Sequence, residues 1–241
     1  MPDAASLPAA LGRSFEAVLL DMDGTLVDST PSVERSWLRW CTEHGVDPRR
    51  LAGSHGVTAR NLIADLLPPA QHESAYARIV ELEVGDVAGT QLLPGALELL
   101  GALRDAGVPT AIVTSSNREL ARARLEVTRL PRPSVVVTAD DVARGKPFPD
   151  PWLLGATRLG VASADCLVIE DAVAGLRAAR AAGCGGLVAV PTTTSAEQLE
   201  AVADLVVGGL TELRLDLGDG RARVLPGPGR PGPAPRGPVS A

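Results

Sequence analysis

Apolar residues recur along this chain with two different spacings. Between residues 30 and 90 they return at helical intervals, which predicts helices over about 31–44, 58–67 and 70–86 and no strand. From Leu93 onward, short apolar runs alternate with amphipathic stretches. Alternating strands and helices are typical of a doubly wound parallel sheet, so the predicted fold class is α/β.

The predicted strands are continuously apolar, as expected for strands that are buried on both faces of a sheet. They cover about residues 18–20, 108–114, 135–137, 167–169, 187–190 and 205–207. Because the helical segment comes directly after the first strand, we interpret it as an insert in the sheet domain. The expected organisation is a core domain of residues 14–29 and 91–225, a helical domain of residues 30–90, and flexible tails of residues 1–13 and 226–241.

Composition narrows the class of protein. The chain has 241 residues and is 45% apolar, so it can bury a sizeable core, and its net charge of −6 argues against nucleic acid or an anionic membrane as a partner. Three cysteines without metal-ligand spacing are expected to be reduced and mostly buried. No signal peptide or long apolar stretch is visible, so we expect a cytoplasmic protein. We also expect a monomer or a weak dimer.

Polar side chains stand at the carboxyl ends of three of the predicted strands. In chain order they are Asp21 and Asp23, then Thr114, Ser115 and Ser116, then Glu170 and Asp171. The first carboxylate pair, taken alone, would also suit an ordinary turn. The carboxyl ends of parallel strands share one edge of a sheet, however, so all of these groups can meet in one site.

Lys146 is the single lysine among 23 basic residues, and the other 22 are arginines. It lies in a loop after the third predicted strand, at the same edge of the sheet. A surface lysine could have become arginine like the rest, whereas a site that needs a compact point charge cannot take a planar guanidinium. We therefore expect Lys146 to belong to the site rather than to be an accident of composition.

Carboxylates at this density repel one another unless a cation joins them. Ligands that are all oxygen favour a hard ion such as Mg²⁺, which binds through one or two carboxylates, waters and a phosphate. Hydroxyl groups and Lys146 would then donate to phosphate oxygens. Because aspartyl-phosphate chemistry is an established route for phosphoryl transfer, the sequence predicts a metal-dependent reaction of a phosphate ester.

Four segments in this order resemble the four motifs of the haloacid dehalogenase superfamily, and the helical insert resembles its C1 cap. The segments are Asp21-Met22-Asp23-Gly24-Thr25, Thr114-Ser115-Ser116, Lys146-Pro147-Phe148-Pro149 and Glu170-Asp171-Ala172-Val173. The resemblance covers roughly residues 14–215. It implies a Rossmann-like core sheet with an all-helical cap domain.

The resemblance also implies a role for each motif residue. Asp21 would be the nucleophile that forms an aspartyl phosphate, and Asp23 would protonate the leaving group and then activate water. Lys146 would bridge the phosphate and Asp21. Mg²⁺ would be held by Asp21, Asp171 and the main-chain carbonyl of Asp23, and through water by Glu170.

The phosphate would be held by Thr114 and the main-chain amides after it. For Ser115 and Ser116, a turn or helix-capping role is as compatible with the sequence as direct contact with the phosphate. In the cap, His55 and Arg60 are the candidate substrate contacts. His55 would equally suit an exposed loop, and Arg60 a solvated helix face.

Asp23 favours a phosphatase or a phosphomutase over a dehalogenase, because a leaving alkoxide needs a proton and a halide does not. Further segments resemble bacterial sugar phosphatases, which act on hexose, 2-deoxyglucose and sugar-alcohol phosphates. The expected partner is therefore a small sugar or polyol phosphate. A β-phosphoglucomutase-like transferase remains an alternative, and a non-catalytic sugar-phosphate-binding module is a third.

Overall fold

The computed structural model describes residues 7–227 and 230–231, and its main element is a seven-stranded sheet. Six strands run parallel, and their order across the sheet is β9-β8-β7-β2-β5-β6. Their bounds are β2 (Ala17–Leu20), β5 (Thr110–Val113), β6 (Val135–Val137), β7 (Cys166–Glu170), β8 (Gly186–Ala189) and β9 (Leu205–Val206). These are the six strands predicted from the apolar runs, so the α/β class is confirmed.

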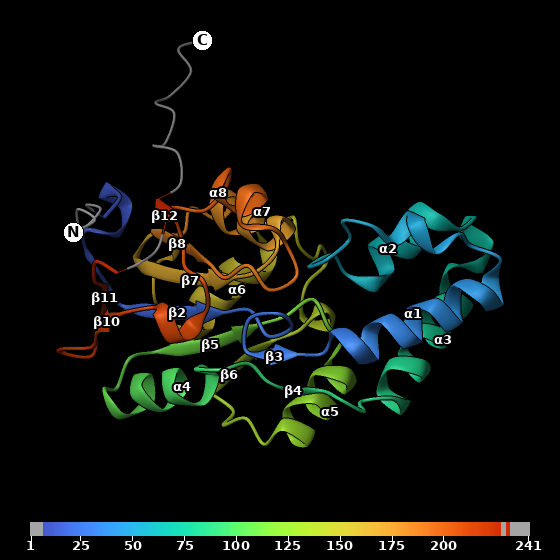
Figure 1. Cartoon of the computed structure of the whole chain (residues 1–241), viewed down its shortest axis with the longest axis horizontal. Coiled ribbons are helices and arrows are strands. Elements are labelled where there is room, and N and C mark those ends of the chain that lie inside the picture. Colours follow the sequence, from blue (N-terminus) through green and yellow to red (C-terminus); the bar gives the residue numbers. More distant parts are fainter. Residues whose placement is uncertain (1–6, 228–229, 232–241) are drawn as a thin grey trace, which may run out of the picture.

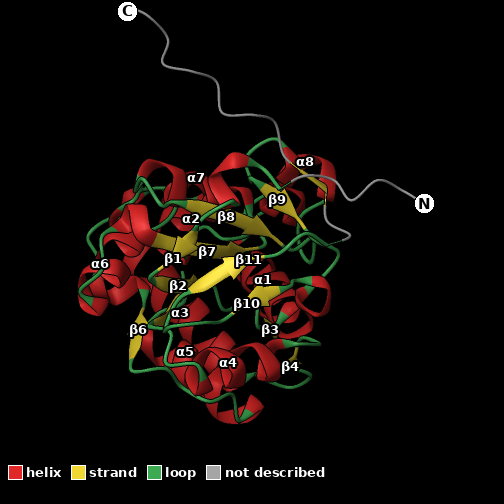
Figure 2. Cartoon of the chain, turned by 90° about the vertical axis from the view of Figure 1, so that its left-hand side faces the viewer, coloured by secondary structure: helices red, strands yellow, loops and turns green. Residues whose placement is uncertain are grey.

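Helices cover both faces of this sheet (Figures 1 and 2). Their bounds are α4 (Ala96–Asp105), α5 (Arg118–Thr128), α6 (Asp150–Leu159), α7 (Val173–Ala181) and α8 (Ala196–Glu200). Alternate residues of β2 face opposite sides: Val18 packs in one cluster with Leu103 of α4, and Leu19 packs in the other with Trp152 of α6. Burial on both faces explains the continuously apolar strands.

The helical insert, residues 30–90, lies to one side of the sheet, beyond the carboxyl end of β2 (Figure 1). It contains α1 (Thr30–His44), α2 (Ala59–Leu66) and α3 (His72–Gly85). These helices bury a core of their own around Trp40 and Ile79, and Trp40 Nε1 donates to the carbonyl of Ala75 at 2.8 Å. The predicted helices are confirmed.

Two short strands join the insert to the sheet. β3 (Val27–Asp28) and β4 (Gln91–Leu92) pair antiparallel, so the chain leaves and re-enters the core side by side. Sequence reasoning missed this pair because two residues are too few to show a period. The two chain connections between the insert and the core therefore lie side by side.

The structure corrects the expected tails in two places. Leu11, in a 3₁₀ turn at Ala9–Leu11, is fully buried in the core beside Phe15, so part of the expected N-terminal tail is packed. At the other end, β12 (Arg230–Pro231) pairs with β9. In the N-terminal segment, two leucines (Leu7 and Leu11) among Ala and Pro residues are too few to establish a period. The expected tail residues 1–6, 228–229 and 232–241 lie outside the described residues.

A small antiparallel sheet also forms near the chain ends, from β1 (Ser14–Phe15), β10 (Leu215–Asp216) and β11 (Ala222–Val224). Cys41, Cys166 and Cys184 are free and buried, as predicted. Among the described residues, no helix is long and apolar enough to cross a membrane.

Candidate active site

The polar strand ends meet at one edge of the sheet, because β2 lies between β7 and β5. Asp21 comes directly after β2 and extends its ladder, with its main-chain N–H donating to the carbonyl of Ile169 at 3.0 Å. Thr114 extends β5 in the same way, through a 2.9 Å bond to Val137. Glu170 is the last residue of β7. The backbone of three adjacent strands therefore fixes where these side chains start.

Lys146 lies at the centre of this edge and is fully buried. Its Nζ donates to Asp21 Oδ1 at 2.6 Å, to Glu170 Oε2 at 2.8 Å and to the carbonyl of Val113 at 3.0 Å. The ammonium also lies 4.4 Å from the ring centre of Trp152. Burial alone would lower the pKa of Lys146, but the charges of Asp21 and Glu170 outweigh it and raise that pKa, so the side chain is an ammonium ion.

Asp21, Glu170 and Asp171 bring carboxylate oxygens within 4.8 Å of one another, and all three side chains are buried. Burial, and then the charge of Glu170, raise the pKa of Asp21 to about 8. Burial, and then the charge of Asp21, raise the pKa of Asp171 to about 7, and burial raises that of Glu170 to about 7. The single positive charge of Lys146 thus does not neutralise the three carboxyl groups of the cluster.

This cluster has the properties of a site for a divalent cation. Its donors are all oxygen, which suits a hard ion. The backbone next to the cluster approaches it closely, which only glycine allows. A Cβ on Gly24, whose φ is +88°, would lie 2.1 Å from Asp171 Oδ2. Asp171 is further held by the hydroxyl of Thr193, which donates to the same Oδ2. Sequence reasoning missed Thr193, although a run of threonines after β8 was a usable signal.

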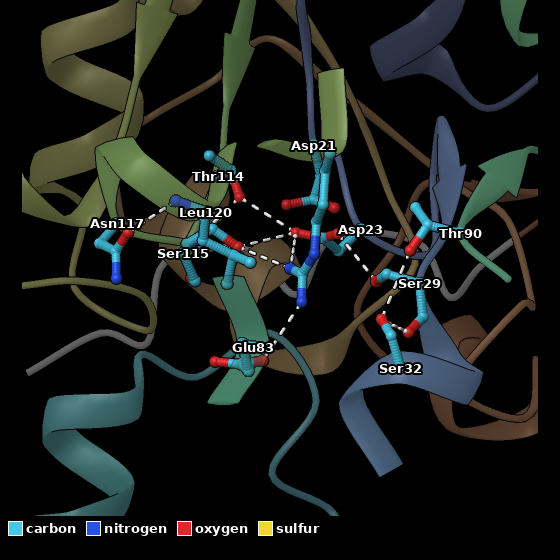
Figure 3. A network of polar contacts seen from close by, with 12 residues as sticks. Asp21, Asp23, Ser29, Ser32, Glu83, Thr90, Thr114, Ser115, Asn117 and Leu120 are labelled. Atoms are coloured by element: carbon cyan, nitrogen blue, oxygen red, sulfur yellow. Dashed lines mark hydrogen bonds and ion pairs between the residues drawn. The ribbon is translucent and has the colours of Figure 1, made fainter. Parts of the chain in front are cut away.

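Asp23 has a different set of partners from Asp21 (Figure 3). Its Oδ1 accepts from the hydroxyl of Ser29 at 2.8 Å. Its Oδ2 accepts from Ser116 Oγ at 2.9 Å and lies 2.9 Å from a guanidinium nitrogen of Arg124. A single residue separates the two aspartates in the sequence, but their side chains lie in different environments. Asp21 lies beside an ammonium and carboxylates, and Asp23 lies among hydroxyls and an arginine.

The three hydroxyl residues after β5 have distinct contacts. Thr114 Oγ1 accepts from the N–H of Ser116 at 3.0 Å and lies 3.4 Å from Asp23 Oδ2. Ser115 Oγ donates to the carbonyl of Gly56 in the helical insert at 2.7 Å. The N-cap of α5 is Asn117, which accepts from the N–H of Leu120 at 2.9 Å. Neither serine caps this helix.

A cavity of about 650 Å³ separates the sheet edge from the helical insert. Asp21, Asp23 and Thr114 lie on its core side. Its insert side is largely apolar and includes Val33, Trp37, Leu62 and Val80.

Both insert candidates, His55 and Arg60, line this cavity and are exposed. Arg60 is also engaged within the insert: its guanidinium donates to Glu73 at 2.8 Å and lies 3.8 Å from the ring centre of Tyr76. Of the residues predicted from sequence, the motif residues are therefore brought together, whereas these two remain on the opposite wall.

Arg124 and Glu83 are the site residues that sequence reasoning missed. Arg124 lies on the buried side of α5, where Leu120, Ala121 and Leu125 also point, and only 3% of it is exposed. A cation on the apolar side of an amphipathic helix was the available signal. Glu83 is one of several acidic residues in and around α3, and nothing in its spacing distinguishes it.

Comparison with known proteins agrees with this geometry. Residues 15–183 match the family model described as haloacid dehalogenase-like hydrolase. The chain is 43% identical to hexitol phosphatase A of Escherichia coli (strain K12), over 81% of this chain and 91% of that protein. It is 36% identical to validoxylamine A 7'-phosphate phosphatase of Streptomyces hygroscopicus subsp. limoneus, over 83% of this chain and 96% of that protein.

Solved structures give the same result. A variant of CbbY from Rhodobacter sphaeroides, in complex with xylulose-(1,5)bisphosphate, superposes with a TM-score of 0.72 at 25% identity, over 83% of this chain and 96% of that one. The family model spans more than half of the chain and includes the strand ends that carry the carboxylates. This chain is a member of the haloacid dehalogenase-like hydrolase family.

Proposed function

We propose that this chain is a Mg²⁺-dependent phosphatase that hydrolyses small sugar or polyol phosphate monoesters through an aspartyl phosphate on Asp21. The observation that carries the proposal is the contact of Asp21 with the buried Lys146, at 2.6 Å, where Asp21 lines the floor of a cavity that Asp23 also lines. A carboxylate, a fixed ammonium and a second carboxyl group are the parts that phosphoryl transfer to an aspartate requires.

The cation would be held by Asp21, Asp171 and the main-chain carbonyl of Asp23, with Glu170 reaching it through water. A Mg²⁺ ion bound there would neutralise charge on the phosphoryl oxygens and hold the carboxylates ionised. Without a cation the pKa of Asp21 is about 8, so at neutral pH the side chain would be mostly protonated. The nucleophile has to be the carboxylate, which supports a bound cation that lowers this pKa. The ammonium of Lys146 supplies a second positive charge, between Asp21 and Glu170.

The two aspartates divide the reaction. The carboxylate of Asp21 attacks phosphorus, the ester P–O bond breaks, and the departing alkoxide takes a proton from the carboxyl group of Asp23. A water molecule then gives its proton to the Asp23 carboxylate and attacks phosphorus, which releases phosphate and restores Asp21. Thr114 and the main-chain amides after it bind the phosphate oxygens during both steps.

Substrate selection is assigned to the helical insert. We propose that residues 30–90 act as a cap domain on a core domain of residues 14–29 and 91–225. The insert forms the far wall of the cavity, where His55 and Arg60 lie beside apolar side chains. Similarity to hexitol phosphatase A supports a sugar or polyol phosphate as the substrate class.

A phosphate-release screen over a panel of sugar and polyol phosphates tests the proposal. With Mg²⁺ we expect several members to be hydrolysed to completion, no hydrolysis in EDTA, and recovery when Mg²⁺ is added back. Isomerisation of a sugar phosphate without phosphate release would indicate a mutase instead. Hydrolysis that persists in EDTA would contradict the roles given to Asp171 and Asp23.

A further inference from the structure

Arg124 joins three groups that come from different parts of the molecule. It extends from α5 of the core, and its guanidinium lies 2.9 Å from Asp23 Oδ2 and donates to Ser116 Oγ at 2.9 Å. On its other side it donates to Glu83 Oε1 at 3.2 Å, and Glu83 lies in α3 of the helical insert. Figure 3 shows Asp23 and Glu83 on either side of this network.

The network is buried although it is charged. Arg124 is 3% exposed and Glu83 is 8% exposed. Burial raises the pKa of Glu83, while the charge of Arg124 opposes this shift. A buried ion pair of this kind is often no more stable than an apolar pair of the same volume. Packing alone is therefore a weak reason for an arginine at this position.

One further atom argues against a purely structural role. Within the described part of the chain, Nε of Arg124 is buried and has no hydrogen-bond partner. A buried donor without a partner costs stability. The guanidinium is thus held where it contacts Asp23 and Glu83 at the expense of one unpaired donor.

We propose that Arg124 is a positioning residue: it holds the side chain of Asp23 where the leaving group will be, and through Glu83 it links this placement to the position of the helical insert. The inference rests on the proposed function, because it assigns Asp23 the proton transfer. In this arrangement Ser29 fixes one carboxyl oxygen of Asp23, and Ser116 with Arg124 fixes the other. Removing the guanidinium leaves Oδ2 held by hydroxyls alone.

The reaction gives this role a specific signature. A proton from Asp23 neutralises the oxygen as the P–O bond breaks, so a well-placed Asp23 makes the rate insensitive to the basicity of the leaving group. A misplaced Asp23 slows poor leaving groups and spares p-nitrophenolate, which departs without a proton. The kinetic constant to measure is kcat/KM, because it includes the steps up to release of the alcohol and excludes hydrolysis of the aspartyl phosphate.

The experiment compares ring-substituted phenyl phosphates, from p-nitrophenyl phosphate to phenyl phosphate, in the full-length protein with Mg²⁺. These esters are nearly identical in shape, so the slope of log kcat/KM against leaving-group basicity isolates the proton transfer. We expect Arg124→Met to lose about tenfold more activity on phenyl phosphate than on p-nitrophenyl phosphate. Glu83→Gln should lose about threefold more, and Arg124→Lys should fall between wild type and Arg124→Met.

Arg122→Gln is the matched control, because Arg122 lies on the same helix, is 67% exposed and pairs with Glu126. Its slope should equal that of wild type. The ratio of two substrates does not depend on how much of a variant is folded, so partial unfolding does not disguise the result.

An Arg124→Met variant that loses the same factor on every ester would overturn the inference, since a purely structural residue has that effect. The proposed function fails separately, if Asp21→Asn still releases phosphate.

Discussion

The floor and the far wall of the cavity are built in opposite ways. On the floor, Asp21 lines the cavity and is held from beneath by buried charged groups. Lys146 Nζ lies 2.6 Å from Asp21 Oδ1 and 2.8 Å from Glu170 Oε2, and all three side chains have little or no exposure. The far wall, from the helical insert, is largely apolar, and its charged candidate Arg60 is exposed. Strand ends fix the floor, whereas solvent-accessible helix surfaces form the wall.

This difference predicts where substitutions are tolerated. Removing one partner of a buried ion pair leaves an uncompensated charge and costs about 3–5 kcal/mol. An exposed pair is worth about 0–1 kcal/mol. Changes among the buried groups should therefore abolish the chemistry or the fold, and changes at the exposed wall residues His55 and Arg60 should adjust substrate choice alone.

The largest effect is expected at Asp21. Asp21→Asn removes the nucleophile while keeping the size of the side chain, and we expect kcat for p-nitrophenyl phosphate to fall by at least about 10⁴-fold. Circular dichroism should show an unchanged fold, because the variant also relieves repulsion within the carboxylate cluster. Turnover close to that of wild type would refute the assignment of the floor.

Lys146 should come next. Lys146→Met leaves Asp21 and Glu170 facing each other without a cation, so we expect kcat/KM to fall about 10²–10³-fold and the free energy of unfolding to fall by about 3–5 kcal/mol. Lys146→Arg should also fail, because a fully buried site for a compact ammonium does not accommodate a planar guanidinium.

The matched control for Lys146 is Arg104→Gln, which removes a pair with Asp105 in which both side chains are 69% exposed. It should change the free energy of unfolding by less than about 1 kcal/mol. Activity in Lys146→Arg equal to that of wild type would show that the site requires charge and not shape. The claim that this buried site requires a compact ammonium would then be wrong.

The floor is also the part that could be predicted from sequence. Val18, Leu19 and Leu20 form a continuous apolar run, and such a run indicates both that a strand exists and that it is buried on two faces. Residues directly after such a strand then lie at the edge of the sheet. Lys146 was marked by composition, as the single lysine, and the structure buries it between Asp21 and Glu170.

The rest escaped prediction for physical reasons. Arg124 and Glu83 meet across the boundary between the core and the insert, and no period in the sequence encodes a contact between elements so far apart in the chain. Ser29 precedes α1 at a position that suits a capping residue, but its hydroxyl donates to Asp23 and makes no capping bond. Polar contacts of this kind depend on the relative placement of elements, which local patterns do not contain.

The buried carboxylate cluster should also make the stability of the protein depend on pH. In EDTA the folded-state pKa values of Asp21, about 8, and of Glu170 and Asp171, about 7, lie above the ordinary values near 4. The folded state therefore binds more protons than the unfolded state across this range, and stability falls as pH rises from about 4 to 8. We expect Tm in EDTA to drop by several degrees between pH 6 and pH 8.

Mg²⁺ binds the ionised carboxylates, so it should raise Tm more at pH 8 than at pH 6. Asp21→Asn removes the group with the highest of these pKa values and should flatten the profile in EDTA. A Tm that stays level in EDTA, or that rises between pH 6 and pH 8, would show that the carboxylate cluster is not short of positive charge.

The smallest effect is expected on the far wall, at Arg60. Its guanidinium is shared with Glu73 and Tyr76, and the side chains of Arg60 and Glu73 are 55% and 84% exposed. Arg60→Gln should therefore raise KM for a sugar phosphate by no more than about threefold and leave kcat for p-nitrophenyl phosphate unchanged. His55→Ala provides the comparison, since His55 lines the same cavity from a loop. If Arg60→Gln instead reduced kcat for both substrates, Arg60 would take part in the chemistry, and its assignment to substrate selection would be wrong.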